Sequence, residues 1–182
     1  QDVQLKLVNR DGVLQAKLIK ANLYQGVFRG EMRLDASGKK PKLQVKEKLT
    51  NLQIGPLLKD LVGEDRLLGA GAVDMDLSMV GLDERSIRQS LSGTASFDFR
   101  NGAYKGVNLA QLIRTGGGLL GKGATGQSAR TDFSELSGSV VINKGKIHNQ
   151  DLSAKSPLIR VTGAGDVDLK TDIIDYRLVV EL

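Results

Sequence analysis

The chain has 182 residues, of which 40% are hydrophobic and 26% are charged, and its formal net charge is +5. This balance is typical of a folded globular chain and excludes a disordered or membrane-spanning class, since no apolar run approaches about eighteen residues. The absence of cysteine and the presence of one histidine, His148, exclude disulfides, thiol nucleophiles, zinc-finger spacings and most histidine-based catalysis.

Apolar and polar residues alternate along most of the chain. Phe28, Met32 and Leu34 alternate with arginine and glutamate, and the same period of two returns around residues 73–77, 95–99 and 174–182. Strands with one apolar and one polar face are typical of antiparallel sheets, and regular crossover helices are missing. We therefore predict a mainly β fold: a curved antiparallel sheet of repeated hairpins, as an open groove or half-pipe, with two or three short helices packed against it.

Short helices are predicted at three places. Residues 55–62 carry Leu57 and Leu58 on one stripe, Asp83 is a suitable N-cap for 84–91, and Asn108 is one for 109–115. The glycine-rich stretch 116–126 is predicted to be a loop. Other glycines are expected at turns or strand starts, and Asn101-Gly102 and Lys144-Gly145 are expected to occupy equivalent positions in a repeated strand–glycine–strand unit.

We divide the chain into a β-rich groove segment, residues 1–54, and a second segment, residues 55–182, which we expect to continue the same sheet. Because the first and last residues fall within alternating strands, we expect the chain to be a piece of a longer protein, so the absence of export or anchoring signals from it is weak evidence.

No convincing catalytic or metal-ligand set emerges from the sequence. Residues 116–123 approach a phosphate-binding loop, but Gly123 follows Lys122 where a Ser or Thr is required. The carboxylate pairs Asp74/Asp76 and Asp166/Asp168 are read as parts of a solvated sheet face, and His148 as a surface residue. We expect no enzyme activity, cofactor or metal.

A basic stretch lies between residues 39 and 48. Nucleic acid binding is one interpretation, but aromatic residues are only 4% of the chain and no recognition motif is present. A strand with a solvated lysine face that guards a sheet edge is another, and attraction to anionic lipid headgroups is a third. We expect no nucleic acid partner.

The apolar face itself is the remaining candidate site. It can be the core of a closed sandwich or the lining of an open groove for acyl chains, and the sequence leaves both open. The residues predicted to line such a groove are Val73, Met75, Leu77, Phe97, Phe99, Val140, Ile142, Ile174, Tyr176, Leu178 and Val180.

The second segment resembles the C-terminal region of AsmA family proteins. The resemblance rests on the order and spacing of several blocks, which are LSGTASFDFRNGAYKGVNLAQLIR at 91–114, TDFSELSG at 131–138, NQDL at 149–152, SPLIRVTGAGDVDL at 156–169 and IDYRL at 174–178. Residues 1–54 match only in strand character. No catalytic residue is carried over, because the family has no agreed catalytic motif.

This resemblance implies a Gram-negative envelope protein in the periplasm, anchored to the inner membrane by a segment not included in the chain. It implies a non-enzymatic role in phospholipid transport and outer-membrane biogenesis, in which acyl chains are shielded in an apolar β-groove. The implied partners are phospholipid acyl chains, the inner membrane and other envelope proteins. The alternative is a closed β-domain that acts as an assembly scaffold or partner-docking module.

Overall fold

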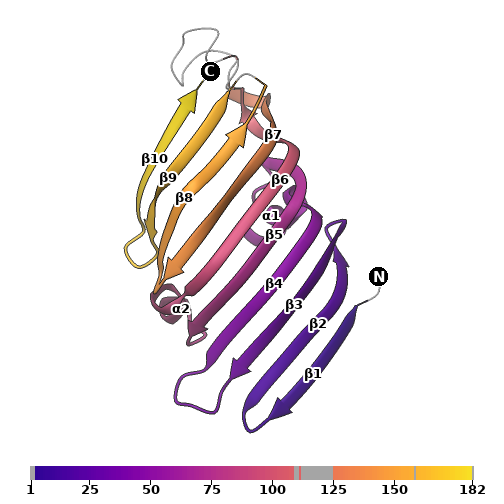
Figure 1. Cartoon of the computed structure of the whole chain (residues 1–182), viewed down its shortest axis with the longest axis vertical. Helices are drawn as coiled ribbons and strands as arrows, with labels where there is room; N and C mark the ends of the chain where they lie inside the picture. Colours follow the sequence, from indigo (N-terminus) through magenta and orange to yellow (C-terminus); the bar gives the residue numbers. More distant parts are fainter. Residues whose placement is uncertain (1–2, 109–110, 112–124, 158, 182) are drawn as a thin grey trace.

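Ten strands form one antiparallel sheet in which each strand pairs with the next one in the chain (Figure 1). The computed structural model describes residues 3–108, 111, 125–157 and 159–181. The strands are β1 (Gln4–Arg10), β2 (Val13–Leu23), β3 (Gly26–Asp35), β4 (Lys42–Gln53), β5 (Leu67–Val80), β6 (Ser92–Val107), β7 (Thr125–Asn143), β8 (Lys146–Lys155), β9 (Arg160–Asp168) and β10 (Ile173–Glu181). The predicted antiparallel, mainly β fold is confirmed, and with β1 and β10 at opposite ends the sheet is not a closed barrel.

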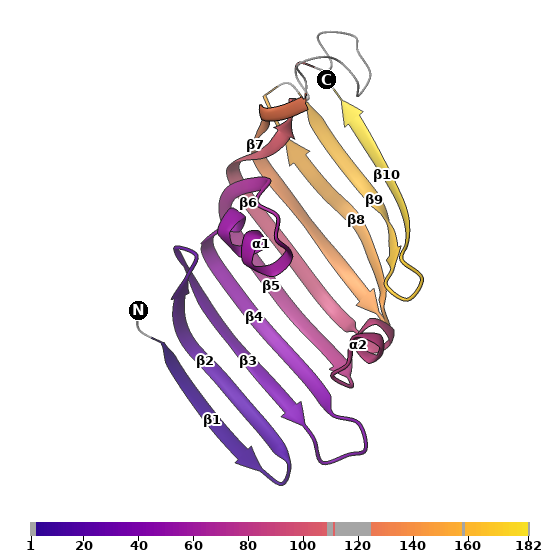
Figure 2. The same cartoon turned by 180° about the vertical axis from the view of Figure 1, so that it is seen from behind.

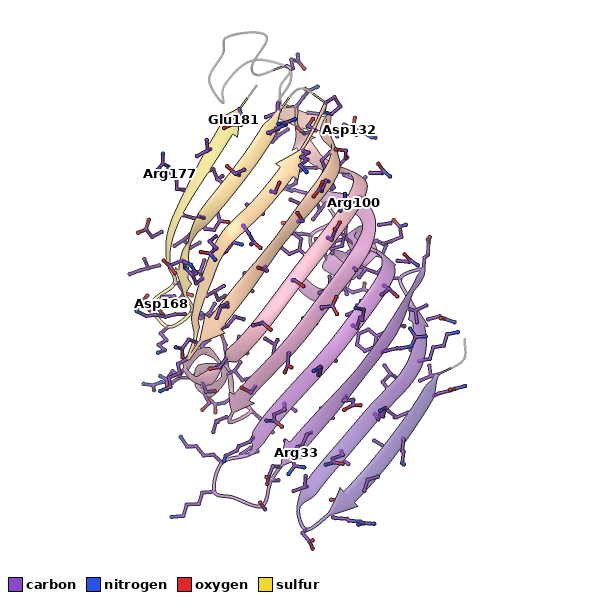
Figure 3. The ribbon with its side chains drawn as sticks, in the orientation of Figure 1. Arg33, Arg100, Asp132, Asp168, Arg177 and Glu181 are labelled. Atoms are coloured by element: carbon purple, nitrogen blue, oxygen red, sulfur yellow. The ribbon has the colours of Figure 1, made fainter. Side chains whose placement is uncertain are left out.

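The strand register gives the sheet one apolar and one polar face. Val73 of β5 stands between Leu49 of β4 and Phe97 of β6, whereas the next residue, Asp74, stands between Lys48 and Ser96. Successive side chains of a strand point to opposite faces, so the apolar residues of paired strands lie on one face of the sheet and the polar residues on the other. Figure 3 views the polar face, from which side chains such as Arg33, Arg100 and Arg177 project.

Helix α1 (Ile54–Val62) follows β4 directly and folds back over the apolar face (Figure 2). It covers the ends of the central strands, where Leu57 and Leu58 pack against a cluster of buried side chains. That cluster consists of Leu49, Leu52, Ile54, Phe99 and Phe133. Gly63 ends the helix with φ 75°, a left-handed conformation that glycine adopts without strain.

Helix α2 (Glu84–Ser90) connects β5 to β6 at the other end of these strands. The side chain of Asp83 accepts a hydrogen bond from the backbone N–H of Ser86 at 2.9 Å, which confirms the predicted cap. Arg88 then ties the helix to the β9–β10 hairpin, because its guanidinium donates to a carboxylate oxygen of Asp172 at 2.6 Å and to the carbonyl oxygen of Leu169 at 3.0 Å.

Two asparagines interrupt the strand alternation. Asn51 has φ 56° and Asn101 has φ 49°, and the register shifts beside each of them. Asn101-Gly102 therefore lies inside β6, which corrects the expectation of a turn there, whereas Lys144-Gly145 does form the β7–β8 turn. Glycine is required at 102 because a Cβ atom would come within 2.1 Å of the carbonyl oxygen of Leu68.

The third predicted helix, 109–115, lies outside the described residues apart from Gln111, whose backbone N–H is 2.9 Å from the side-chain oxygen of Asn108. The glycine-rich stretch 116–124 also lies outside them, and the last two residues of the predicted loop, Thr125 and Gly126, begin β7. The two expected segments share one sheet, because β4 pairs with β5 along most of its length.

Within the described part of the chain, no second protein layer covers the apolar face apart from α1, which lies over the ends of the central strands. The accessible surface is 12026 Å², whereas a compact monomer of this mass exposes about 8,600 Å². The excess is the expected consequence of a sheet that keeps both faces open over much of its length.

Candidate functional site on the apolar face

All of the residues predicted to line a groove lie on the apolar face. Phe99 and Ile142 are buried, Val73, Met75, Leu77, Phe97, Val140 and Tyr176 are half-buried, and Ile174, Leu178 and Val180 are exposed. The register joins them through β8 and β9, since Ile142 pairs with Ile147, Ile147 with Val167 and Val167 with Ile174. Their contact with lipid stays a prediction, but their arrangement as one apolar strip is a property of the sheet.

The strip also extends toward β1. Leu5 and Leu7 of β1 pair with Leu18 and Ala16 of β2 on the same face and are 53% and 60% exposed. Isolated apolar residues on a surface need no explanation, but a contiguous apolar strip marks a binding surface for a ligand, membrane or protein. The strip thus runs from one edge strand to the other.

One end of the apolar face is hollowed beside α1. This hollow has a volume of about 380 Å³, within the range of roughly 300–1,000 Å³ that is usual for small-molecule sites. Its apolar lining includes Leu67, Tyr104, Phe133, Leu136, Ile159 and Val161. The sequence did not reveal this set because its members come from β5, β6, β7 and the start of β9, and only the pairing of these strands brings them together.

Two polar residues on the apolar face, Asn149 and Tyr176, have hydrogen-bond partners there. Asn149 is 7% exposed, and its Nδ2 donates to the carbonyl oxygen of Ser139 at 2.7 Å and to Oδ1 of Asp151 at 2.8 Å. The hydroxyl of Tyr176 donates to Oδ1 of Asn149. Burial and the nearby Asp151 carboxylate raise the pKa of Tyr176, so this hydroxyl stays a neutral donor.

Glu47 also lies on the apolar face, but the described residues include no hydrogen-bond or ion-pair partner for it. It pairs with Gly30 of β3 and Met75 of β5, and burial raises the pKa of its carboxyl group. The signal was present in the sequence: Glu47 is in phase with Leu43, Val45 and Leu49, whereas Lys46 and Lys48 are out of phase. Glu47 is therefore a candidate residue that was not among the predicted ones, although its position in the alternation distinguishes it from the lysines.

The polar face is crossed by exposed ion pairs. Lys46 and Lys48 of β4 lie 3.4 and 3.2 Å from the carboxylates of Asp76 and Asp74, and Lys17 lies 2.8 Å from Glu31. These side chains line a hollow of about 720 Å³, larger than the one on the apolar face, but paired charges are unsuited to hydrocarbon. Because β4 is an interior strand, the interpretation of its lysines as guards of a sheet edge is wrong.

Other candidate groups lie on the polar face as well. His148 Nδ1 is 2.9 Å from a carboxylate oxygen of Asp166, and both side chains are exposed. Asp74 and Asp76 are in ion pairs with lysine, as expected of a solvated face. Among the described residues, no three His, Asp or Glu side chains are grouped closely enough to hold a metal ion, and neither helix is long and apolar enough to cross a bilayer.

Fold and site together define a class of protein: an open antiparallel sheet that presents an uncovered apolar face. The AsmA family model matches residues 1–152, so the chain belongs to the AsmA family. This match includes residues 1–54, where the sequence motifs gave no resemblance beyond strand character. Membership in this family indicates an envelope-related function.

The chain is also similar to Protein AsmA of Escherichia coli (strain K12). The two are 25% identical over 181 residues, which cover 97% of this chain and 29% of the relative. The chain therefore spans less than a third of that protein. No solved structure matches the chain.

Proposed function

We propose that this chain is a lipid-handling segment of an envelope protein, in which phospholipid acyl chains lie against the apolar face of the sheet. The observation that carries the proposal is the uncovered strip from β5 to β10, on which Ile174, Leu178 and Val180 are 70%, 58% and 56% exposed. In the described residues no protein element covers this strip, and acyl chains are apolar like the side chains that form it.

The energetic case rests on the cost of moving lipid through water. Each buried methylene contributes about 0.8 kcal/mol, so a sixteen-carbon chain exposed to water costs on the order of 12 kcal/mol. A continuous apolar strip removes much of that cost along the whole path, whereas isolated apolar patches would leave gaps. The hollow beside α1 offers a more enclosed position for the end of a chain.

The wider role that we propose is non-enzymatic: support of phospholipid transport and outer-membrane biogenesis in the Gram-negative periplasm. In this proposal the longer protein is anchored in the inner membrane through a segment outside this chain. Membership in the AsmA family supports this role. Other envelope proteins are proposed as partners of the longer protein.

Two neighbouring residues of β10 provide a sharp test. Leu178 is 58% exposed on the apolar face and Val179 is 38% exposed on the polar face. A photo-crosslinking residue at position 178 is expected to label phospholipid in vesicles or cell envelopes, whereas the same residue at 179 should label little. Mass spectrometry of the adducts identifies the lipid. Equal labelling at both positions, or none at either, would refute the proposal.

A docking surface for a protein partner is the competing function for the same strip. The closed version of that alternative is contradicted by the open sheet. For an open protein-docking face, the crosslinks at position 178 would be to a polypeptide, and the same mass spectra would contain peptide adducts without lipid.

A further inference from the structure

Glu47 is the one charged side chain on the apolar face of β3, β4 and β5. Its neighbours along β4 on that face are Val45 and Leu49, and across the sheet it faces Gly30 and Met75. The carboxylate is half-buried, and no ion pair or side-chain hydrogen bond to it is found in the part of the chain that the structure describes.

The sheet leaves space for this side chain. A Cβ atom at Gly30 would lie 3.0 Å from Cγ of Glu47 and 2.8 Å from the carbonyl oxygen of Lys46. Any larger residue at position 30 would displace the Glu47 side chain, which lies over the Gly30 backbone. The glutamate is therefore part of the packed surface of this face.

The nearby cations are on the other face, and the lysines among them are paired. Lys46 and Lys48 flank Glu47 in β4 and face Asp76 and Asp74 of β5. Beside Gly30 in β3, Arg29 and Glu31 also point to the polar face, and Glu31 pairs with Lys17 of β2. Hydrocarbon laid against Glu47 would thus cover an acid that has no counter-charge, which is unfavourable unless the ligand brings one.

We propose that Glu47 selects phospholipids with an ammonium headgroup over phospholipids whose headgroup is purely anionic. The ammonium group supplies both the missing positive charge and N–H donors, and charge-assisted hydrogen bonds to a carboxylate are stronger than neutral ones. A purely anionic headgroup brings only repulsion, and this face of β3 to β5 has no lysine or arginine to offset it. The inference rests on the proposed lipid-handling function and adds a headgroup preference to it.

The test is a competition between two lipids with the same acyl chains. The purified chain is incubated with mixed vesicles of dioleoyl-phosphatidylethanolamine and dioleoyl-phosphatidylglycerol, recovered free of vesicles, and the bound lipids are quantified by mass spectrometry. The wild-type chain is expected to enrich phosphatidylethanolamine about two- to five-fold, the scale of a half-exposed ion pair.

Three variants separate the contributions. Glu47→Gln should abolish the enrichment with little change in total bound lipid, and Glu47→Lys should reverse it in favour of phosphatidylglycerol. Glu31→Gln removes an acid of neighbouring β3 from the polar face and should leave the enrichment unchanged. Circular dichroism checks that each variant is folded.

The outcomes distinguish this inference from the proposed function. Total lipid bound by the wild-type chain tests lipid handling, whereas the ratio of the two lipids tests the role of Glu47. If lipid binds but the ratio is the same in wild type and Glu47→Gln, the headgroup preference is refuted and lipid handling stands. If binding falls with rising pH for both lipids equally, Glu47 is neutralised by protonation instead, which also refutes the preference. If no lipid binds, both proposals fail.

Discussion

Glu47 and Glu31 are acids on adjacent strands whose environments shift their pKa values in opposite directions. Burial on the apolar face raises the pKa of Glu47, whereas a hydrogen bond from Lys17 lowers the pKa of Glu31 on the polar face. The two residues are close in space and differ mainly in the face that they occupy. A single step of strand register thus decides whether a carboxylate is paired or isolated.

These shifts predict opposite pH dependence. A raised folded-state pKa means that the folded chain holds the Glu47 proton more tightly than the unfolded chain, so its contribution to stability is lost as pH rises through the folded pKa. Glu47→Gln should therefore stabilise the chain at pH 7.5, by less than about 1 kcal/mol because the side chain keeps contact with water. Near pH 4 the variant and the wild type should have similar stability. Urea unfolding at the two pH values measures this.

Glu31→Gln is the matched control for that measurement. The lowered pKa of Glu31 stabilises the fold above the unfolded pKa and is lost as pH falls through the folded value. Its replacement should lower stability at pH 7.5 and have less effect near pH 4. The same sign of change at pH 7.5 in both variants would contradict the assignment of the two faces.

At the scale of elements, the strands were predictable because the period of two is a local property. Asp83 and the apolar stripe of α1 likewise predict the two described helices. The bulges at Asn51 and Asn101 were not predictable from the pattern, because asparagine tolerates a left-handed backbone but does not require it. The hollow lined by Phe133 and Leu136 was not predictable either, because its residues come from several strands whose pairing the period of two does not specify.

The cap of α2 provides a prediction at this scale. Asp83→Ala removes the hydrogen bond to the N–H of Ser86 and should cost about 1 kcal/mol, the usual effect of losing an N-cap side chain. Asp83→Asn keeps an acceptor and should lose only part of that stability. Thermal unfolding measures both variants, and an unchanged melting temperature in Asp83→Ala would show that the cap does not stabilise the fold.

At the scale of the molecule, stability is concentrated where α1 covers the sheet. Leu52 is 1% exposed in that cluster, whereas Val140 is only half-buried on the uncovered strip. One layer of sheet with a local core differs from a sandwich, in which nearly all inward positions would be fully buried. Fully buried residues such as Leu52 therefore stabilise the fold, whereas half-buried residues such as Val140 are available to a ligand.

Aspartate substitutions should reveal this difference. Val140→Asp is expected to leave cooperative folding intact, at a cost of about 1–2 kcal/mol, and to lower bound lipid. Leu52→Asp should prevent folding, because an unpaired carboxylate in a buried cluster costs several kcal/mol. Val141→Asp, on the polar face beside Val140, is the control that should preserve both folding and lipid binding. Unfolding of the chain by Val140→Asp alone would contradict an open face.

The sequence by itself determined the strand class, the antiparallel pairing and the membership of each alternating residue in one of two faces. These features follow from the period of two along each strand, and no contact between distant residues is needed to infer them. Only the tertiary structure decided that β4 is an interior strand and that, in the described part of the chain, much of the apolar face stays uncovered and Glu47 has no charged partner. Those features depend on how neighbouring strands pair and what lies above the sheet, and a periodic pattern is the same for a closed core and for an open one.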